Sequence, residues 1–252
     1  SNSRAVNQFP HEWRMATYSF NYLPMLNESG KIDTQQAKLP AHLDMVEKIK
    51  EADEPIALVM TGPLTDLARA LDVDPDIEKN IEKLYWMGGS LDGHGNVAMV
   101  NADGSQEWNS FWDPYAVKRV FESNIPIQMV GLESTEELPL NDELRQHWAS
   151  LRKYPAMDLI GQGYSLIVSI PSAELYLWDV LTTISALYPE VVETETAKAR
   201  VITDGLSAGS FVRDPKGREV TLVTKANKDL FFQKMDEINK KEAHASFLYC
   251  LN

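Results

Sequence analysis

Three short apolar runs in this chain are each followed directly by polar or glycine residues. These segments are Thr61-Gly62 after the run 55–60, Gly88-Gly89 after 83–87, and Thr135-Glu136 after 126–132. In a wound α/β sheet, ligands bind outside the carboxyl ends of the strands. The three segments therefore predict a small-molecule site at one edge of a sheet. The alternative is that the glycines only turn the chain, because Gly and Pro dominate turns in general.

Asp179 is a further candidate, because it interrupts an apolar stretch. It lies between Leu177-Trp178 and Val180-Leu181 on a predicted amphipathic helix. An aspartate on a solvated helix surface is the ordinary alternative. A buried carboxylate without a partner is costly, however, and favours a nearby cation. The surroundings of Asp179 therefore predict contact with a metal or a sugar.

The elements that would position these residues alternate between strands and helices. Predicted strands cover 55–60, 83–87, 126–132, 199–203 and 219–224; predicted helices cover 41–53, a segment through Ala70, 113–122, 141–153, 156–166, 174–187 and 227–240. The run 55–60 is apolar throughout, which is typical of a strand buried on both faces. The alternation predicts an α/β fold with a mostly parallel wound sheet and helices on both faces. No linker or repeat divides the chain, so one domain over residues 1–252 is the prediction.

Composition limits the classes of function. The chain of 252 residues carries 24 Lys and Arg against 37 Asp and Glu, a net charge of −13. This balance argues against a nucleic-acid partner, which would require clustered basic residues. It is compatible with small neutral substrates and with cations.

The cysteine count and the ends of the chain say little about the compartment. Cys250 is the only cysteine, so no disulfide closes within the chain. No apolar run of about 18 residues predicts a membrane span. The start, Ser1–Asn7, has neither an initiator Met nor the apolar centre of a signal peptide, and we expect a processed or cleaved end. Localisation therefore stays unknown.

Several short motifs, in this order and spacing, resemble the inosine–uridine nucleoside hydrolase family. They are ThrGlyProLeuThrAspLeuAla (61–68), MetGlyGly (87–89), GlyAsn (95–96), GluTrpAsn (107–109), AspPro-x-Ala (113–116), MetValGlyLeu (129–132) and TrpAsp (178–179). The resemblance covers the chain from about residue 40 to its end. It implies a nucleoside hydrolase-like fold and hydrolysis of the N-glycosidic bond of ribonucleosides around a bound calcium ion.

The resemblance also implies roles for single residues. Thr61 matches a threonine whose main-chain carbonyl ligates calcium, and Asp179 matches a late aspartate that ligates calcium and contacts the ribose. Calcium prefers such carbonyl and carboxylate oxygens. Met87 matches a residue that lines the sugar. Glu107 and Asn109 match binders of the ribose hydroxyls, and an N-terminal cap for the helix near Asp113 is the alternative for both.

Two further matches in the sugar site are less direct. Trp108 stands where the family usually has phenylalanine. Asn96 matches another binder of the ribose hydroxyls, but the interval from Asn96 to Glu107 is longer than usual in the family. Asn101 is therefore an alternative for that role.

One departure from the family is a missing segment. The family's aspartate-rich opening, Asp-x-Asp-x-x-x-Asp-Asp at the end of the first strand, does not occur in this sequence. In the family it supplies most calcium ligands and the general base. Calcium needs six to eight oxygens, which Thr61 and Asp179 alone do not provide. We therefore expect the first strands to be absent from this chain, and either a companion N-terminal segment pairs with it or the chain alone is not an enzyme.

A second departure is Trp178, where many members have a histidine that protonates the leaving base. An indole cannot transfer a proton, so no catalytic residue is assigned within this chain. His11 and His94 are conceivable donors, although isolated loop histidines are mostly solvent-exposed.

The function we expect from the sequence is calcium-dependent hydrolysis of ribonucleosides or of a related ribosyl-like substrate. The alternative is a non-catalytic sugar- or nucleoside-binding protein on the same scaffold, which Trp178 favours. The expected partner is a small nucleoside or sugar. Base preference stays undetermined, and homo-oligomerisation stays open.

Overall fold

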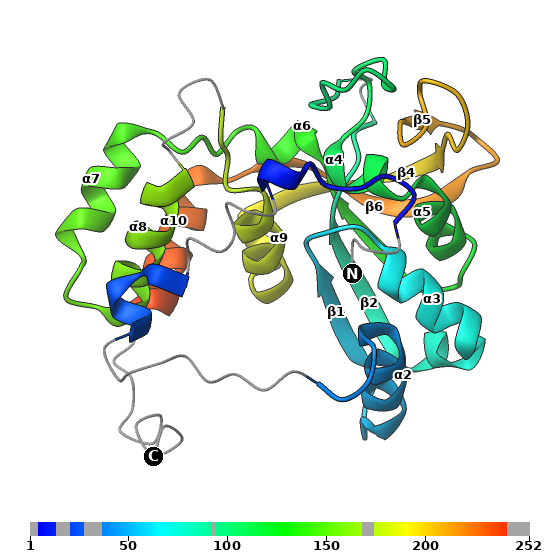
Figure 1. Ribbon diagram of the computed structural model, residues 1–252, viewed down its shortest axis with the longest axis horizontal. Coiled ribbons are helices and arrows are strands. Elements are labelled where there is room, and N and C mark those ends of the chain that lie inside the picture. Colours follow the sequence, from blue (N-terminus) through cyan, green and yellow to red (C-terminus); the bar gives the residue numbers. More distant parts are fainter. Residues whose placement is uncertain (1–4, 14–20, 28–36, 92–93, 168–173, 241–252) are drawn as a thin grey trace. The chain divides into compact units, whose positions relative to one another are not determined.

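The computed structural model describes residues 5–13, 21–27, 37–91, 94–167 and 174–240 (Figure 1). Contacts divide the chain into two compact units. Unit 1 comprises Ser1–Pro10, Gln35–Leu138 and Tyr176–Asn227; unit 2 comprises His11–Thr34, Pro139–Leu175 and Lys228–Asn252. Apart from His11, the candidate site residues named above belong to unit 1.

Unit 1 is built on a six-stranded sheet with the order β1-β2-β3-β6-β4-β5. Its strands are β1 (Ile56–Met60), β2 (Ile81–Met87), β3 (Ile127–Val130), β4 (Val192–Val201), β5 (Phe211–Arg213) and β6 (Arg218–Ala226). Neighbouring strands from β1 to β6 run parallel, whereas β4 is antiparallel to both β6 and β5. The prediction of an α/β fold is confirmed, with a parallel half and an antiparallel half.

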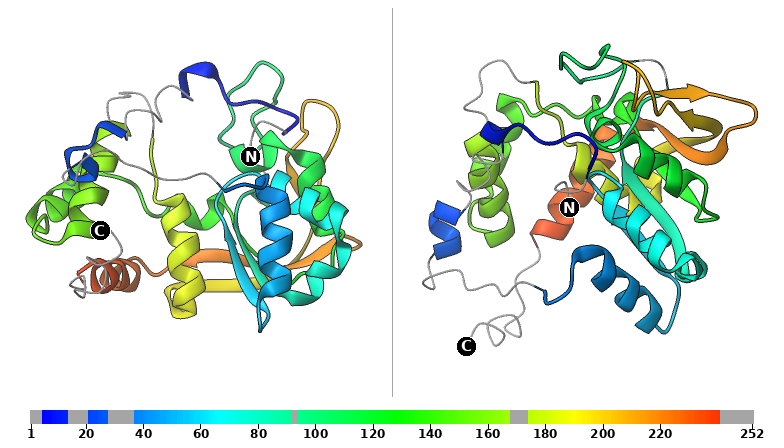
Figure 2. Two further views of the ribbon diagram at one scale, coloured as in Figure 1. Left: turned by 60° about the horizontal axis from the view of Figure 1, so that its bottom comes forward. Right: turned by 45° about the vertical axis from the view of Figure 1, so that its right-hand side comes forward.

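The helices of unit 1 lie on both faces of this sheet (Figures 1 and 2). They are α2 (Ala41–Glu51), α3 (Thr65–Val73), α4 (Trp108–Trp112), α5 (Pro114–Phe121), α6 (Leu132–Thr135) and α9 (Trp178–Leu187), with 3-10 turns η4 (Pro75–Asn80) and η5 (Pro189–Val191). On the face covered by α3 and α5, Trp86 and Met129 are fully buried. On the other face, Gln128 donates a hydrogen bond to Ser185 of α9. Successive residues of β3, Gln128 and Met129, thus face opposite sides of the sheet, as the alternation of side chains along a strand requires.

The expectation that the run 55–60 is buried on both faces is wrong. Ile56, Leu58 and Met60 pack against the core, but Ala57 and Val59 are exposed, Val59 at 41%. Among the described residues β1 pairs only with β2, so it lies at the end of the sheet. Although α9 contacts β1, it leaves Ala57 and Val59 exposed, which the apolar sequence alone could not reveal.

The second half of unit 1 differs from the predicted boundaries. The predicted strand 199–203 is the end of β4, which begins already at Val192, and β5 was not predicted. Glu193, Thr194 and Glu195 are exposed, so this part of β4 lacks the apolar alternation of a typical strand. The predicted helix 174–187 begins only at Trp178.

Unit 2 contains α7 (Asp142–Ser150), α8 (Pro155–Ile167), α10 (Lys228–Asn239) and the 3-10 turn η3 (Pro24–Asn27). The buried Trp148 of α7 lies against Tyr164 of α8, with ring centroids 5.2 Å apart. The predicted helices 141–153, 156–166 and 227–240 correspond to these three α-helices. None of the helices in the described parts of the chain is long and apolar enough to cross a bilayer.

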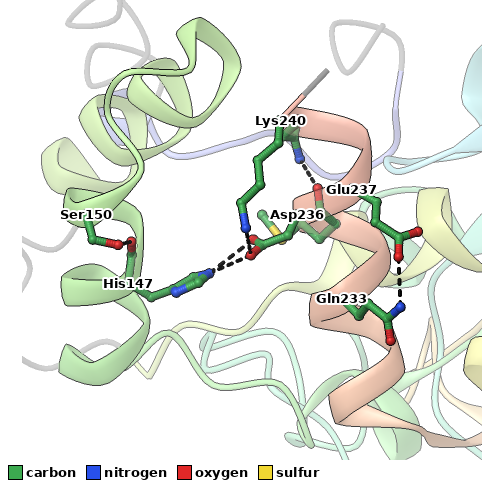
Figure 3. A network of polar contacts seen from close by, with 8 residues as sticks. His147, Ser150, Gln233, Asp236, Glu237 and Lys240 are labelled. Atoms are coloured by element: carbon green, nitrogen blue, oxygen red, sulfur yellow. Dashed lines mark hydrogen bonds and ion pairs between the residues drawn. The ribbon is translucent and has the colours of Figure 1, made fainter. Parts of the chain in front are cut away.

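An ionic cluster connects α7 with α10 in unit 2 (Figure 3). The ring Nε2 of His147 lies 2.9 and 3.1 Å from the two carboxylate oxygens of Asp236. Lys240 donates to the same carboxylate over 2.6 Å. Asp236 is only 18% exposed and is thus the shared acceptor of both contacts. Glu237, by contrast, accepts bonds from Gln233 and Lys234 of its own helix.

Replacing Asp236 by alanine is expected to lower the free energy of unfolding by about 1 kcal/mol, the usual size for a partly exposed ion-pair cluster. The change removes the link from α10 to His147 as well as the contact with Lys240. Denaturant unfolding of the variant measures this loss. Glu237→Ala on the same helix is the matched control and should change the free energy by less than about 0.5 kcal/mol. Equal losses in both variants would contradict a role of Asp236 in joining the helices.

Candidate functional site

The candidate site lies at the carboxyl ends of β1 and β2. Thr61 directly follows β1 and Met87 ends β2, and because the strands are parallel these ends meet at one edge. Asn109 of α4 connects them, since its Nδ2 donates to the Met87 carbonyl over 2.9 Å and lies 3.4 Å from the Thr61 carbonyl. The structure therefore brings Thr61, Met87 and Asn109 together, although they lie far apart in the sequence.

Glu107 is the buried centre of this edge. It is 2% exposed and precedes α4 as its N-cap. One carboxylate oxygen accepts a bond from the backbone N–H of Asn109 (2.9 Å), and the other accepts from Gly89 (2.9 Å) and Ser110 (3.1 Å). Burial raises the pKa of Glu107 to about 7, a rise to which the charge of Asp179 adds and which the three N–H bonds oppose.

The capping alternative for Glu107 is thus realised, but for α4 rather than for the helix near Asp113. That next helix, α5, is capped by Asp113 itself, which accepts a bond from the N–H of Ala116. Asp113 also accepts a buried 2.7 Å bond from the Thr65 hydroxyl of α3. This supporting contact was not predicted from the sequence, although an aspartate before Pro114 is a usual signal for the start of a helix.

The glycine pair after β2 is needed where it stands. A Cβ on Gly88 would lie 2.2 Å from the Trp86 ring. Gly89 has a φ of +76° and would place a Cβ 2.3 Å from the Met129 side chain. The glycines therefore turn the chain, and the same turn brings the Gly89 N–H to Glu107. The glycine pair therefore turns the chain and also contributes to the candidate site, so the two alternatives considered from the sequence are compatible.

Asp179 lies in the first turn of α9, which packs against β1 and β2. Asp179 retains solvent exposure. Surrounding protein atoms nevertheless desolvate its carboxylate and raise the pKa of Asp179 to about 6, and a hydrogen bond with the Thr61 side chain opposes this rise. Because its charge also acts on Glu107, two carboxylates with raised pKa values share this edge. A shared negative field of this kind favours a cation or hydroxyl donors.

Trp178 precedes Asp179 and packs edge-on against Tyr176, with ring centroids 5.6 Å apart. Its indole Nε1 is buried and has no hydrogen-bond partner among the described residues. This side chain can offer an aromatic surface and a hydrogen-bond donor, but no titratable proton.

The loop that follows β2 returns to the same edge. The side-chain oxygen of Asn96 accepts a 3.2 Å bond from the Trp108 N–H, which places Asn96 at the start of α4. Asn101 is exposed, and its Nδ2 lies 3.5 Å from the side chain of Asn7. Trp108 stacks on Trp112 with centroids 4.8 Å apart. Of the two asparagines considered from the sequence, Asn96 is the one that contacts the GluTrpAsn motif.

The two histidines considered as proton donors belong to different units, His94 to unit 1 and His11 to unit 2. His94 is exposed and its Nε2 lies 2.9 Å from a carboxylate oxygen of Glu136, beside a cavity of about 440 Å³. His11 is exposed and belongs to unit 2.

The chain matches the sequence model described as inosine-uridine preferring nucleoside hydrolase over residues 15–233. It is similar to a Bacillus anthracis inosine-uridine preferring nucleoside hydrolase structure, with 45% identity, a TM-score of 0.90 and coverage of 96% of this chain and 79% of the other.

Two curated bacterial relatives match over a smaller share of their length. A non-specific ribonucleoside hydrolase RihC of Salmonella paratyphi A is 33% identical over 74% of this chain and 60% of its own length. A pyrimidine-specific ribonucleoside hydrolase RihA of Shewanella woodyi is 41% identical over 39% of this chain and 30% of its own length. The chain thus spans less than two thirds of either relative.

Proposed function

The chain belongs to the inosine-uridine preferring nucleoside hydrolase family, as the motifs predicted, and we propose that it hydrolyses the N-glycosidic bond of ribonucleosides. The observation that carries the proposal is the meeting of Thr61, Glu107, Asn109 and Asp179 at one edge of the sheet. The relatives named as ribonucleoside hydrolases support the same reaction class.

The donor set at this edge fits a hard cation. It offers the Thr61 carbonyl and the Asp179 carboxylate, both oxygen ligands of the kind that calcium prefers. We propose that these two groups hold Ca²⁺. A bound calcium ion would supply positive charge that orients a sugar diol and water.

The described residues provide too few ligands for a complete calcium shell. Among them, no group of three or more His, Cys, Asp or Glu side chains could hold a metal ion. We therefore propose that a companion segment outside this sequence contributes the remaining ligands and the general base.

The side chains of this chain would bind and orient the sugar. Glu107 is held rigidly by three N–H bonds, and Asn109 by its bond to the Met87 carbonyl. A carboxyl and an amide held in this way can accept from and donate to neighbouring hydroxyls. Met87 and Trp108 would lie against the sugar, with Asn96 beside them, and the substrate would be fixed before its bond is cleaved.

Protonation of the leaving base is not assigned to this chain. Trp178 has no titratable proton at neutral pH, and its aromatic ring is suited to packing against a flat base. This observation also favours a second candidate, a sugar- or nucleoside-binding protein without catalysis on the same scaffold.

We expect the natively folded protein to release ribose from uridine or inosine, to lose this activity with a calcium chelator and to regain it with added Ca²⁺. Intact-mass analysis of the same particle should detect a companion peptide rich in aspartate. A companion peptide without hydrolysis in the presence of Ca²⁺ would contradict the proposal. A single species of this chain that binds nucleosides but leaves them intact would support the binding protein instead.

A further inference from the structure

A second cavity in unit 1 is surrounded by basic side chains. Its volume is about 480 Å³, and its lining includes the charged residues Lys118 of α5, Glu122 directly after α5, Arg200 of β4, Lys216 of the turn before β6, and Arg218 of β6. Four of these five side chains are cationic, although acidic residues outnumber basic ones by 37 to 24 in the chain. We refer to it as the basic cavity.

The basic cavity is distinct from the candidate site. Arg218 begins β6, and one of its Nη atoms donates a 2.7 Å bond to the carbonyl of Ile125, which precedes β3. The cavity therefore lies at the amino ends of these parallel strands, whereas Thr61 and Met87 lie at the carboxyl ends of theirs. Figure 2 shows α5 beside β4 in this part of the unit.

The existing ion pairs leave positive charge in the basic cavity. Lys118 lies 3.9 Å from Glu122, and both side chains are more than half exposed. Arg200 is 3.0 Å from Asp214 and is also largely exposed. Such pairs are screened by solvent and easily rearranged. Lys216 makes no ion pair within the described part of the chain.

Arg218 adds a donor that lacks an acceptor. Its Nε is buried and has no hydrogen-bond partner among the described residues. A buried N–H without a partner is unfavourable. An anion bound beside this guanidinium would supply an acceptor, and guanidinium groups match the oxygens of phosphate particularly well.

The turn between β5 and β6 positions the basic residues Lys216 and Arg218. Asp214 accepts a 2.9 Å bond from the N–H of Lys216, and the N–H of Gly217 bonds to the Asp214 carbonyl over 2.8 Å. A Cβ on Gly217 would lie 2.5 Å from the Ala199 carbonyl oxygen. The glycine thus allows the turn to approach β4, which brings Lys216 and Arg218 to the same cavity as Arg200.

We propose that the basic cavity binds a small phosphate-bearing anion. Cations from three separate segments converge on one concave site, as recognition of a multiply charged tetrahedral group requires. A nucleic-acid chain is the less suitable ligand, because the net charge of −13 repels an extended polyanion. Inorganic phosphate and a nucleoside monophosphate share the recognised group.

Calorimetric titration of the full chain at low salt tests the proposal, with inorganic phosphate and uridine monophosphate as probes. Uridine without phosphate serves as the reference for binding at the candidate site. We expect a single phosphate to bind, and the double variant Arg200→Gln/Lys216→Gln to weaken binding about tenfold or more. Equal affinities for the two probes would mean that the cavity recognises the phosphate group alone. Tighter binding of uridine monophosphate would mean that its nucleoside part also contributes to binding. Both results support the proposed site.

A matched double variant, Lys79→Gln/Lys225→Gln, removes the same charge from two exposed positions outside the basic cavity. It should bind phosphate within about twofold of the parent chain. Equal weakening in both double variants would overturn the proposal, as would no binding of either probe at millimolar concentration. If the first double variant does not fold, the single variant Lys216→Gln replaces it, because Lys216 is exposed.

Discussion

Asp179→Asn is expected to lower kcat/KM for ribonucleoside hydrolysis about 10²- to 10³-fold, the range for losing one well-placed electrostatic group at a reaction centre. Asparagine preserves the size of the side chain and one oxygen, but removes the charge that lies next to Thr61 and acts on Glu107. If Asp179 holds calcium as proposed, the affinity for Ca²⁺ should fall as well. The measurement is the initial rate of ribose release at several Ca²⁺ concentrations.

A matched control for this change is Asp229→Asn. Asp229 lies in the first turn of α10 as Asp179 lies in the first turn of α9, so both changes remove a favourable charge from a helix start. The control should leave kcat/KM within about twofold, because surface substitutions away from a site have small effects. Full activity of Asp179→Asn with unchanged calcium dependence would exclude Asp179 as a ligand.

The parallel half of the sheet was predictable because its strands are short apolar runs flanked by turn residues. β2 and β3 fall within two residues of the predicted segments at either end. The first part of β4 was not predictable in this way, since Glu193 and Glu195 face solvent and the strand is stabilised by pairing with β6. The first residues of β4 pair with residues of β6 that lie about 25 to 35 positions further along the chain, and a local sequence pattern does not contain this information.

The candidate site shows the same division between local and tertiary information. Thr61, Glu107 and Asp179 could be identified as candidates from the order of the motifs in the sequence alone. What the sequence could not supply is the environment of Glu107: its burial, the N–H of Gly89 that reaches it, and the nearby charge of Asp179. These are consequences of the packing of three separate segments, and they set the charge state of the carboxyl group.

Glu107→Gln is expected to remove a pH-dependent destabilisation of about 2 to 3 kcal/mol between pH 5 and pH 8. Burial raises the pKa of Glu107 from 4.5 to about 7 in the folded chain. Below about pH 4.5 the carboxyl is protonated in both the folded and the unfolded state and contributes nothing. As the pH rises towards 7, the unfolded chain ionises first, so the folded state loses stability relative to it. Above about pH 7 the full cost is present.

The neutral glutamine does not titrate, so the difference in unfolding free energy between the variant and the parent should shift in favour of the variant as the pH rises. Loss of acceptors for the N–H groups of Gly89 and Ser110 adds a pH-independent offset. Denaturant unfolding at intervals from pH 5 to pH 8 separates the two contributions. Glu82→Gln, at an exposed position on β2, should show no such shift.

Curves for the parent and Glu107→Gln that run parallel across this range would mean that Glu107 titrates alike in the folded and unfolded chain. The predicted shift would instead mean that the carboxyl changes its charge near neutral pH. In that case Glu107 could donate a hydrogen bond to a sugar hydroxyl when protonated and only accept one when ionised. The affinity for ribonucleosides should then change with the same pKa as the stability, because one proton governs both.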